Sequence, residues 1–227
     1  MKNSDSSDLL KRLGVDIDAE TFQHALTHRS YTYEHDGAPN NERLEFLGDS
    51  VLSLAIAEEV FRLFPELPEG ELAKRHHVVV SAWALARVAR DLNLGPHIRM
   101  GKGEAASGGA DKDNILADTM EAIFGACYLS EGRDAARDLV LRLIAPLLLD
   151  ESVREAGRDW KTDLQVLAQG QRLGDIRYEV TGTGPDHDRT YFATAWVGER
   201  AFAQASASSK KEAERMAARE AVRVLGA

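Results

Sequence analysis

The spacing of the apolar residues changes near residue 150. Before that point, apolar residues recur every three or four positions in segments such as "RLEFLGDSVLSLAIAEEVFRLF" and "ILADTMEAIFGACYL", and this period is typical of helices that bury one face. Pro and Gly separate the segments, as in "HDGAPNN" and "FPELPEGE", and such residues mark turns. The pattern therefore predicts an all-helical domain over residues 1–149.

After residue 158 the pattern becomes mixed. Residues 150–158 are short, charged and contain Gly157, which is typical of a linker. Beyond them, "WKTDLQVLAQGQ" predicts a helix, "IRYEVTGTG" and "RTYFATAWVGE" alternate as strands do, and "RAFAQASAS" is a candidate third strand. A final helix is expected in "SSKKEAERMAAREAVRVL", where serine precedes an apolar stripe. Residues 159–227 thus form a small α+β domain with the order α-β-β-β-α.

The charge of the chain divides at the same point. The net charge is −9, yet residues 159–227 hold ten basic and ten acidic residues, so the whole excess of acid lies in residues 1–158. An acidic chain is an unusual partner for nucleic acid, but a neutral second domain leaves that function open. Cys127 is the only cysteine, and no apolar run of 18 residues or apolar signal core exists. We expect a cytoplasmic protein without a disulfide or membrane span.

Three carboxylates lie along the helix that contains "NNERLEFLGDSVL". Glu42, Glu45 and Asp49 are spaced i, i+3 and i+7, so they share one helix face. That face continues through Leu52 and Ile56, which predicts that Asp49 is already buried. An unpaired buried carboxylate would be costly or would have to protonate. The ordinary explanation is that these acids favour the positive end of the helix and pair with a surface base.

A second helix makes a metal site the stronger interpretation. Asp118 and Glu121 are spaced i, i+3 just before another apolar run. Carboxylates from two helices at one depth cannot all ionise without a cation between them. Oxygen ligands without His or Cys suit Mg²⁺ or Mn²⁺ rather than zinc. The sequence therefore indicates metal-dependent phosphodiester chemistry.

The last helix offers a phosphate site. Lys210 and Lys211 open it, where the helix dipole is already positive, so two cations there are unfavourable unless an anion binds. His187, in the "GPDHDR" loop between two strands, is a second candidate contact. The ordinary alternative, solvated surface lysines, stays open at this point.

These segments together resemble a known family. "NERLEFLGDSVL" resembles the signature of ribonuclease III, and "ILADTMEAIFGA" resembles its second acidic motif. "ALTHRSY", "FPELPEGEL" and "MGKGEAASGG" are similar to further segments of that family, in the same order. "WKTDLQ", "GPDHDR" and "SSKKEAERMAA" resemble a double-stranded RNA-binding domain. The resemblance extends from about residue 8 to the end of the chain.

The resemblance implies an endoribonuclease that cuts both strands of double-stranded RNA. Two subunits of such an enzyme pair as a homodimer, and their acidic clusters line one valley for the duplex. Cleavage leaves 5′-phosphate and 3′-hydroxyl ends with short 3′ overhangs, and ribosomal RNA precursors and other structured transcripts are the expected substrates. Carried over by position, the acids are Glu45, Asp118 and Glu121 as ligands of Mg²⁺, with Mn²⁺ able to substitute, Asp49 and Glu121 as catalytic acids, and Glu42 and Glu69 as additional acids.

In the RNA-binding domain, the resemblance implies that Thr162, Gln165 and His187 face successive minor grooves, where 2′-hydroxyls distinguish RNA from DNA. Lys210 and Lys211 are expected to meet phosphates across the intervening major groove.

The chain departs from the family pattern at four residues. Ala205 and Ala207 replace glycines, Val166 replaces an acid, and His76 stands where arginine is usual. Two competing functions are a double-stranded RNA-binding regulator that does not cleave and a metal-dependent hydrolase of another substrate. The complete set of acids argues against the first, and the C-terminal domain argues against the second.

Overall fold

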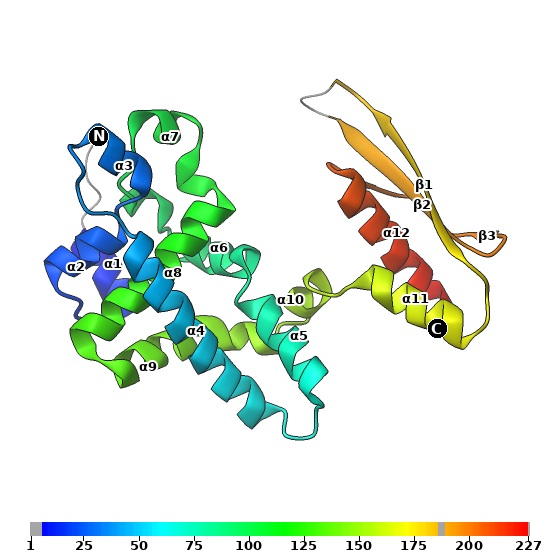
Figure 1. The fold of residues 1–227 in the computed structure, drawn as a ribbon, viewed down its shortest axis with the longest axis horizontal. Helices are drawn as coiled ribbons and strands as arrows, with labels where there is room; N and C mark the ends of the chain where they lie inside the picture. Colours follow the sequence, from blue (N-terminus) through cyan, green and yellow to red (C-terminus); the bar gives the residue numbers. More distant parts are fainter. Residues whose placement is uncertain (1–5, 186–188, 227) are drawn as a thin grey trace. The chain divides into compact units, whose positions relative to one another are not determined.

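The computed structural model describes residues 6–185 and 189–226, which form two compact units, Met1–Gly157 and Arg158–Ala227 (Figure 1). Each unit has its own hydrophobic core. None of the helices in the described part of the chain has the length and apolar character that a membrane span requires.

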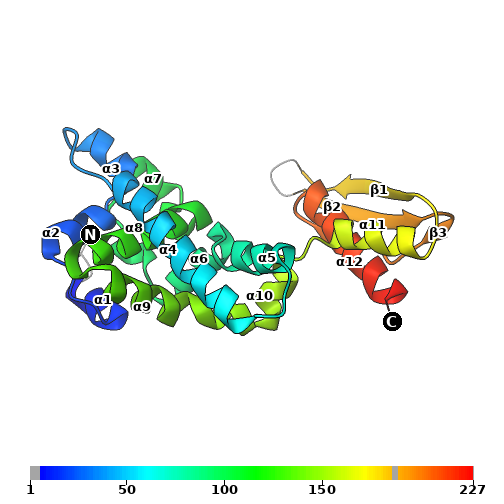
Figure 2. The same ribbon diagram turned by 60° about the horizontal axis from the view of Figure 1, so that its bottom comes forward.

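The N-terminal unit is helical, as predicted. Its core is built around α8, whose residues from Ala122 to Cys127 are all buried, and α4 packs along α8 (Figures 1 and 2). The helices are α1 (Ser6–Leu13), α2 (Ala19–Ala25), α3 (Arg29–Glu34), α4 (Glu42–Leu63), α5 (Glu69–Val79), α6 (Ala82–Asp91), α7 (Lys102–Ala106), α8 (Asp113–Glu131), α9 (Arg133–Ile144) and α10 (Glu151–Ala156), with short 3-10 turns at Gly95–His97, Gly109–Asp111 and Ala145–Leu149.

Most of the segment expected to be a linker is helix α10. The Asp150 carboxylate accepts a hydrogen bond from the Ser152 N–H at 2.9 Å and caps this helix. Val153 is fully buried in the N-terminal core, and Arg87 bonds Asp150 at 2.9 Å. The compact N-terminal unit therefore extends to Gly157. The burial of Val153 and the cap at Asp150 hold α10 against this unit.

The C-terminal unit has the predicted α+β fold. It contains α11 (Trp160–Gly170), β1 (Ile176–Thr183), β2 (Thr190–Val197), β3 (Arg200–Ala201), β4 (Ala205–Ala207) and α12 (Lys210–Leu225). β1 pairs antiparallel with β2, and both short strands pair with β2. The two helices cover one face of the sheet (Figure 2).

The expected third strand is divided into β3 and β4. Phe202 lies between them and is only 8% exposed, because its side chain joins the core. Its N–H still bonds the Ala195 carbonyl at 3.0 Å. The burial of one aromatic residue thus interrupts the regular strand without detaching it from β2.

Candidate active site

Two glycines allow α4 and α8 to cross in direct backbone contact. A Cβ atom on Gly48 would lie 1.7 Å from the Glu121 carbonyl oxygen, and one on Gly125 would lie 2.3 Å from the Leu44 carbonyl oxygen. No side chain fits at either position. Glu45 lies about one turn before Gly48, and Glu121 lies about one turn before Gly125. The close crossing therefore brings these two carboxylates together.

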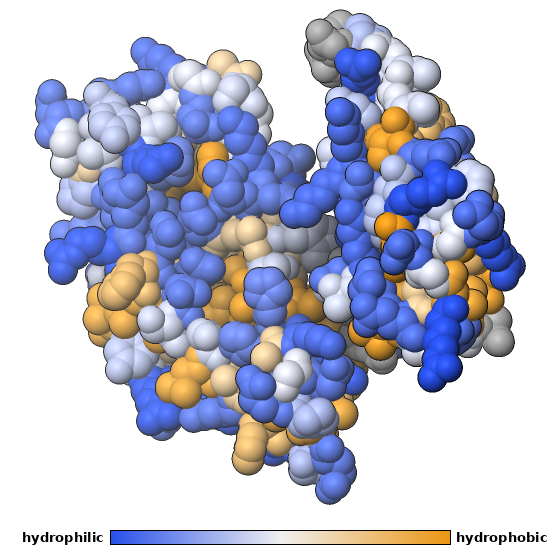
Figure 3. All heavy atoms as spheres, turned by 45° about the vertical axis from the view of Figure 1, so that its right-hand side comes forward, coloured by the Kyte–Doolittle hydropathy of each residue, from blue (hydrophilic) through white to orange (hydrophobic). Residues whose placement is uncertain are grey.

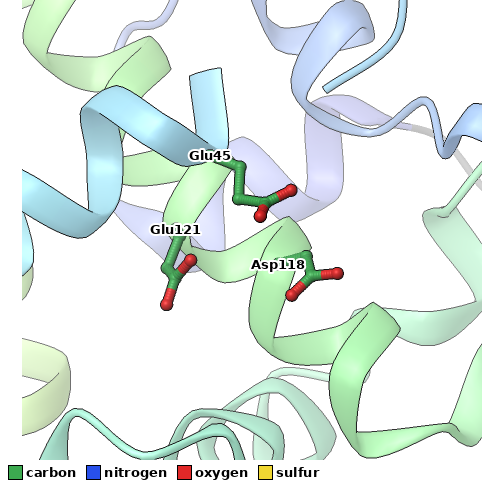
Figure 4. A group of neighbouring side chains, drawn as sticks. All are labelled: Glu45, Asp118 and Glu121. Atoms are coloured by element: carbon green, nitrogen blue, oxygen red, sulfur yellow. The ribbon is translucent and has the colours of Figure 1, made fainter. Parts of the chain in front are cut away.

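Three carboxylates meet at this crossing. Glu45 comes from α4, and Asp118 and Glu121 come from α8, one turn apart (Figure 4). Each offers an oxygen atom such that all three atoms lie within 4.8 Å of one another, and each residue is half-buried. Mg²⁺ binds oxygen at about 2.0–2.1 Å, so oxygens that share one ion lie roughly 3–4 Å apart. Small side-chain rotations would complete that geometry, so the donor set fits a divalent cation.

The electrostatics of the group also favour a cation. Burial, followed by the charges of Asp49, Asp118 and Glu45, raises the pKa of Glu121 to about 8. Burial is also the main cause that raises the pKa of Glu45 and of Asp118. In the absence of a cation, the group therefore holds a proton at neutral pH. A divalent ion would replace that proton.

Asp49 is exposed, which corrects the prediction that it is buried. Gly48 occupies the buried position at this turn of α4, and Asp49 therefore lies at the edge of the contact with α8. Asp49 is not one of the three residues whose oxygens converge. Its charge still raises the pKa of Glu121, so it lies at the open side of the same cluster.

The two additional acids differ in their relation to the cluster. Glu42 is exposed on the first turn of α4, and its charge raises the pKa of Glu45. Glu69 is the exposed first residue of α5 and lies outside the converging group.

His28 and Arg29 lie near the cluster and were not singled out from the sequence. The charges of both lower the pKa of Asp118, while burial lowers the pKa of His28 itself. His28 caps α3, since its Nδ1 accepts from the Ser30 N–H at 3.3 Å. Neither residue belongs to the two acidic helices, so helix periodicity could not reveal them. The signal available was the motif "ALTHRSY".

The candidate RNA-contacting residues of the C-terminal unit lie on the surface. Thr162 and Gln165 are exposed on α11, and the Thr162 hydroxyl donates to Asp159 at 2.7 Å. Lys210 and Lys211 are exposed at the start of α12. His187 lies outside the described residues.

Each departure from the family pattern has a definite environment. Ala205 and Ala207 lie in β4, paired with β2. Val166 is 65% exposed on α11. The Nε2 atom of His76 lies 3.0 Å from the carbonyl oxygen of Ser53 and 3.2 Å from its hydroxyl, so it links α5 to α4 one turn beyond Asp49.

Comparisons with known proteins agree with this arrangement. Residues 18–148 match the ribonuclease-III-like family model, and residues 160–225 match the double-stranded RNA binding motif. A ribonuclease 3 from Streptomyces coelicolor is 52% identical over 95% of this chain and 78% of its own length. One from Leifsonia xyli is 54% identical over 96% of this chain and 92% of its own length. A nuclease domain of ribonuclease III from Campylobacter jejuni has a TM-score of 0.59 and 40% identity, covering 66% of this chain and 99% of that chain.

A helical unit with converging carboxylates, joined to a double-stranded RNA-binding domain, defines an endonuclease that acts on double-stranded RNA. The chain belongs to the ribonuclease III family.

Proposed function

We propose that the protein hydrolyses phosphodiester bonds in both strands of duplex RNA with Mg²⁺ bound by Glu45, Asp118 and Glu121. The observation that supports this most strongly is the convergence of three half-buried carboxylate oxygens within 4.8 Å. The pKa of Glu121 is raised by burial and by three neighbouring carboxylates, which also favours a bound cation. Mn²⁺ has the same preference for oxygen ligands and is expected to substitute.

The protein groups have distinct tasks in this proposal. A bound divalent ion would lower the pKa of water and stabilise charge on the phosphate. Glu45, Asp118 and Glu121 would hold that ion at the helix crossing. Asp49, at the open side of the cluster, accepts a proton from the attacking water. The bond between phosphorus and the 3′-oxygen breaks, and the leaving oxygen takes a proton from solvent. The products have 5′-phosphate and 3′-hydroxyl ends, and paired cuts leave short 3′ overhangs.

The C-terminal unit supplies affinity for the duplex. Thr162 and Gln165 project from the exposed face of α11 and suit minor-groove contacts. Lys210 and Lys211 suit phosphate contacts at the start of α12, where free N–H groups and the dipole also favour anions. His187 stays a prediction. Because A-form shape is recognised, we expect ribosomal RNA precursors and other structured transcripts to be substrates. The cytoplasmic location stays a prediction as well.

We also propose a homodimer through the N-terminal unit. Phe46 and Phe61 on α4 are 79% and 73% exposed, and Leu129 is 61% exposed. Figure 3 shows groups of apolar side chains on the surface of this unit. The description of a related Campylobacter jejuni nuclease domain, 39% identical and with a TM-score of 0.59, refers to a region involved in dimer formation. Residues 1–157 should sediment with the mass of a dimer, and a monomer at micromolar concentration would contradict this part of the proposal.

A cleavage assay separates the candidate functions. The full chain is incubated with a long RNA duplex, a DNA duplex or single-stranded RNA, each with Mg²⁺ or with a chelator. We expect Mg²⁺-dependent cleavage of the RNA duplex alone. Binding of that duplex without cleavage in Mg²⁺ or Mn²⁺ would instead favour a non-cleaving regulator, and absence of both would leave a hydrolase of another substrate.

A further inference from the structure

Arg29, the first residue of α3, is fixed beside the start of α4. The Asn41 N–H, immediately before α4, donates to the Thr27 carbonyl at 2.9 Å. On the other side, the Ser30 hydroxyl accepts a hydrogen bond from the Gly101 N–H at 2.9 Å. The segment that contains Arg29 is therefore held on both sides, and one contact is with the residue that precedes the acidic helix.

The guanidinium of Arg29 is held much less firmly than its backbone. Its Nη1 atom lies 3.8 Å from Oε1 of Glu42, which is too long for a hydrogen bond, and the two side chains are 64% and 54% exposed. Within residues 6–185 and 189–226, this is the only ion pair of Arg29. An exposed pair of this length contributes little to stability. The guanidinium can therefore leave Glu42 for a stronger anion.

The charge of Arg29 reaches the proposed metal ligands. Glu42 lies one turn before Glu45 on α4, so the guanidinium is on the side of the cluster where α4 begins. It lowers the pKa of both Glu45 and Asp118, against the effect of their burial. Arg29 thus lies in a segment that is held in place, its guanidinium has no close ion pair, and it is near the acids.

We propose that Arg29 binds the two nonbridging oxygens of a phosphate in the RNA strand that is cut, beside Glu45 and Asp118. The inference rests on the proposed phosphodiester hydrolysis. RNA must approach a part of the chain that carries the whole net charge of −9, so a cation next to the acids is needed to hold the backbone. Guanidinium is suited to this because its planar donors match two phosphate oxygens at once.

The test uses the full-length protein with Arg29→Ala and Arg29→Lys, and Arg62→Ala as the matched control. Arg62 lies at the other end of α4, is 66% exposed and is likewise paired with one carboxylate, Glu59. Two quantities are measured: the cleavage rate at saturating duplex RNA with Mg²⁺, and the salt dependence of RNA binding without metal. The second quantity does not depend on a loaded active site.

For Arg29→Ala we expect a roughly 10- to 100-fold lower cleavage rate, because one phosphate is no longer oriented over the cluster. The slope of log K against log salt should fall by about one unit, as expected for one lost phosphate contact. Arg29→Lys should recover the slope but only part of the rate, because an ammonium group cannot engage two oxygens. Arg62→Ala should match the wild type in both measurements.

A rate and slope for Arg29→Ala equal to those of Arg62→Ala would overturn the assignment. A rate loss with an unchanged salt slope would also overturn it, since Arg29 would then act only through Glu42. If the wild-type protein does not cleave duplex RNA at all, the proposed function fails, and the metal-free slopes still decide whether Arg29 meets a phosphate.

Discussion

The two units of the protein differ in how their most notable carboxylates are arranged. In the N-terminal unit, a close helix crossing drives Glu45, Asp118 and Glu121 together, and the pKa of each rises. In the C-terminal unit, acids mostly neutralise neighbouring bases, as in the pairs Glu212–Arg215, Glu214–Lys161 and Glu179–Arg177. The net charge of a unit is therefore a poor guide to its partner.

The charged side chains that have no ion-pair partner are a better guide to the partner of a unit. Among the described residues, Lys210 and Lys211 have no carboxylate partner. The ammonium group of Lys210 lies 5.9 Å from the centroid of the Tyr191 ring. A neutral unit can thus present two uncompensated cations. Conversely, an acidic unit can bind a cation at the point where its carboxylates lack a paired basic side chain. The following predictions test this division between a unit for chemistry and a unit for affinity.

Replacement of Glu121 by glutamine should give the largest effect. The change keeps the volume of the side chain and removes one charge from the converging group. Cleavage of duplex RNA should fall by roughly 100-fold or more, because a weaker metal site activates water and stabilises the leaving oxygen less well. Binding should persist, since the variant leaves unchanged both the proposed contacts on the C-terminal unit and Arg29.

Both properties can be measured on one RNA duplex with the wild-type and Glu121→Gln proteins. High Mn²⁺ is expected to restore part of the cleavage by mass action. Near-normal cleavage in Mg²⁺ would remove Glu121 from the proposed metal site. Loss of binding together with cleavage would show that the cluster also shapes the RNA surface, and the division between the units would fail.

The stability of the metal-free protein should fall as the pH rises from about 5 to about 8. The folded-state pKa of Glu121 is about 8, above its ordinary value of 4.5. Between these values the folded state keeps a proton that the unfolded state has lost, so raising the pH favours unfolding. The slope is at most about 1.4 kcal/mol per pH unit, and solvent screening of the half-buried carboxylate makes it smaller. Below the lower value the group has no such effect, and above the higher value its full cost is present.

Urea denaturation at several pH values in a chelator would measure this decline, with Glu121→Gln as the control whose profile should be flatter. Addition of Mg²⁺ at pH 8 should restore stability to the wild-type protein more than to the variant, because the ion binds only the folded state. An identical pH profile for the two proteins would show that Glu121 does not carry the proton.

The sequence indicated two acidic helices that could meet, but not how their carboxylates meet. Periodicity placed Glu45, Asp118 and Glu121 on helix faces, and the fold brings these three together. It could not show that Gly48 and Gly125 set the crossing, because the consequence of a missing side chain depends on the neighbouring helix. For the same reason, Asp49 was expected to be buried and is exposed.

Long-range contacts limited the other predictions in the same way. The alternation of β1 and β2 was visible in the sequence because its period is local. The division of the third strand depends on where Phe202 finds a core, and the helix in the expected linker depends on the burial of Val153. Both outcomes are decided by partners that are distant in the sequence.

Alanine at both Lys210 and Lys211 should weaken duplex binding by a smaller factor than the loss of cleavage in Glu121→Gln. Each lost phosphate contact should lower the slope of log K against log salt by about one unit, hence about two in total. The cleavage rate at saturating RNA should change little, since the carboxylate cluster lies in the other unit. Binding titrations at four salt concentrations, with Arg172→Ala as an exposed control on the same unit, would measure the slopes.

An unchanged slope would mean that the two lysines are ordinary solvated side chains. A lower slope combined with slow cleavage at saturating RNA would mean that the C-terminal unit also positions the strand for cutting. The first result would remove the proposed RNA-binding site from the C-terminal unit. The second would show that this unit contributes to cleavage as well as to binding.

The smallest effect is expected from restoring the two family glycines, Ala205→Gly and Ala207→Gly. Both alanines lie in β4, pair with β2 and pack against the core of the C-terminal unit. Neither has a positive φ angle, so alanine fits this backbone without strain. Each glycine should therefore destabilise the unit by roughly 0.5–1 kcal/mol through the greater flexibility of the unfolded chain.

Affinity for duplex RNA should change by less than about threefold, because β4 ends before the lysines and keeps its pairing with β2. Urea denaturation of residues 158–227 and RNA titration of the full chain would check the two expectations, with Ser206→Gly as the control at the exposed position between the alanines. A tenfold gain in affinity would show that the alanines restrict the approach of Lys210 and Lys211 to phosphate. The RNA affinity of the C-terminal unit would then be limited by the stiffness of β4, which precedes the two lysines, and not by the number of lysines.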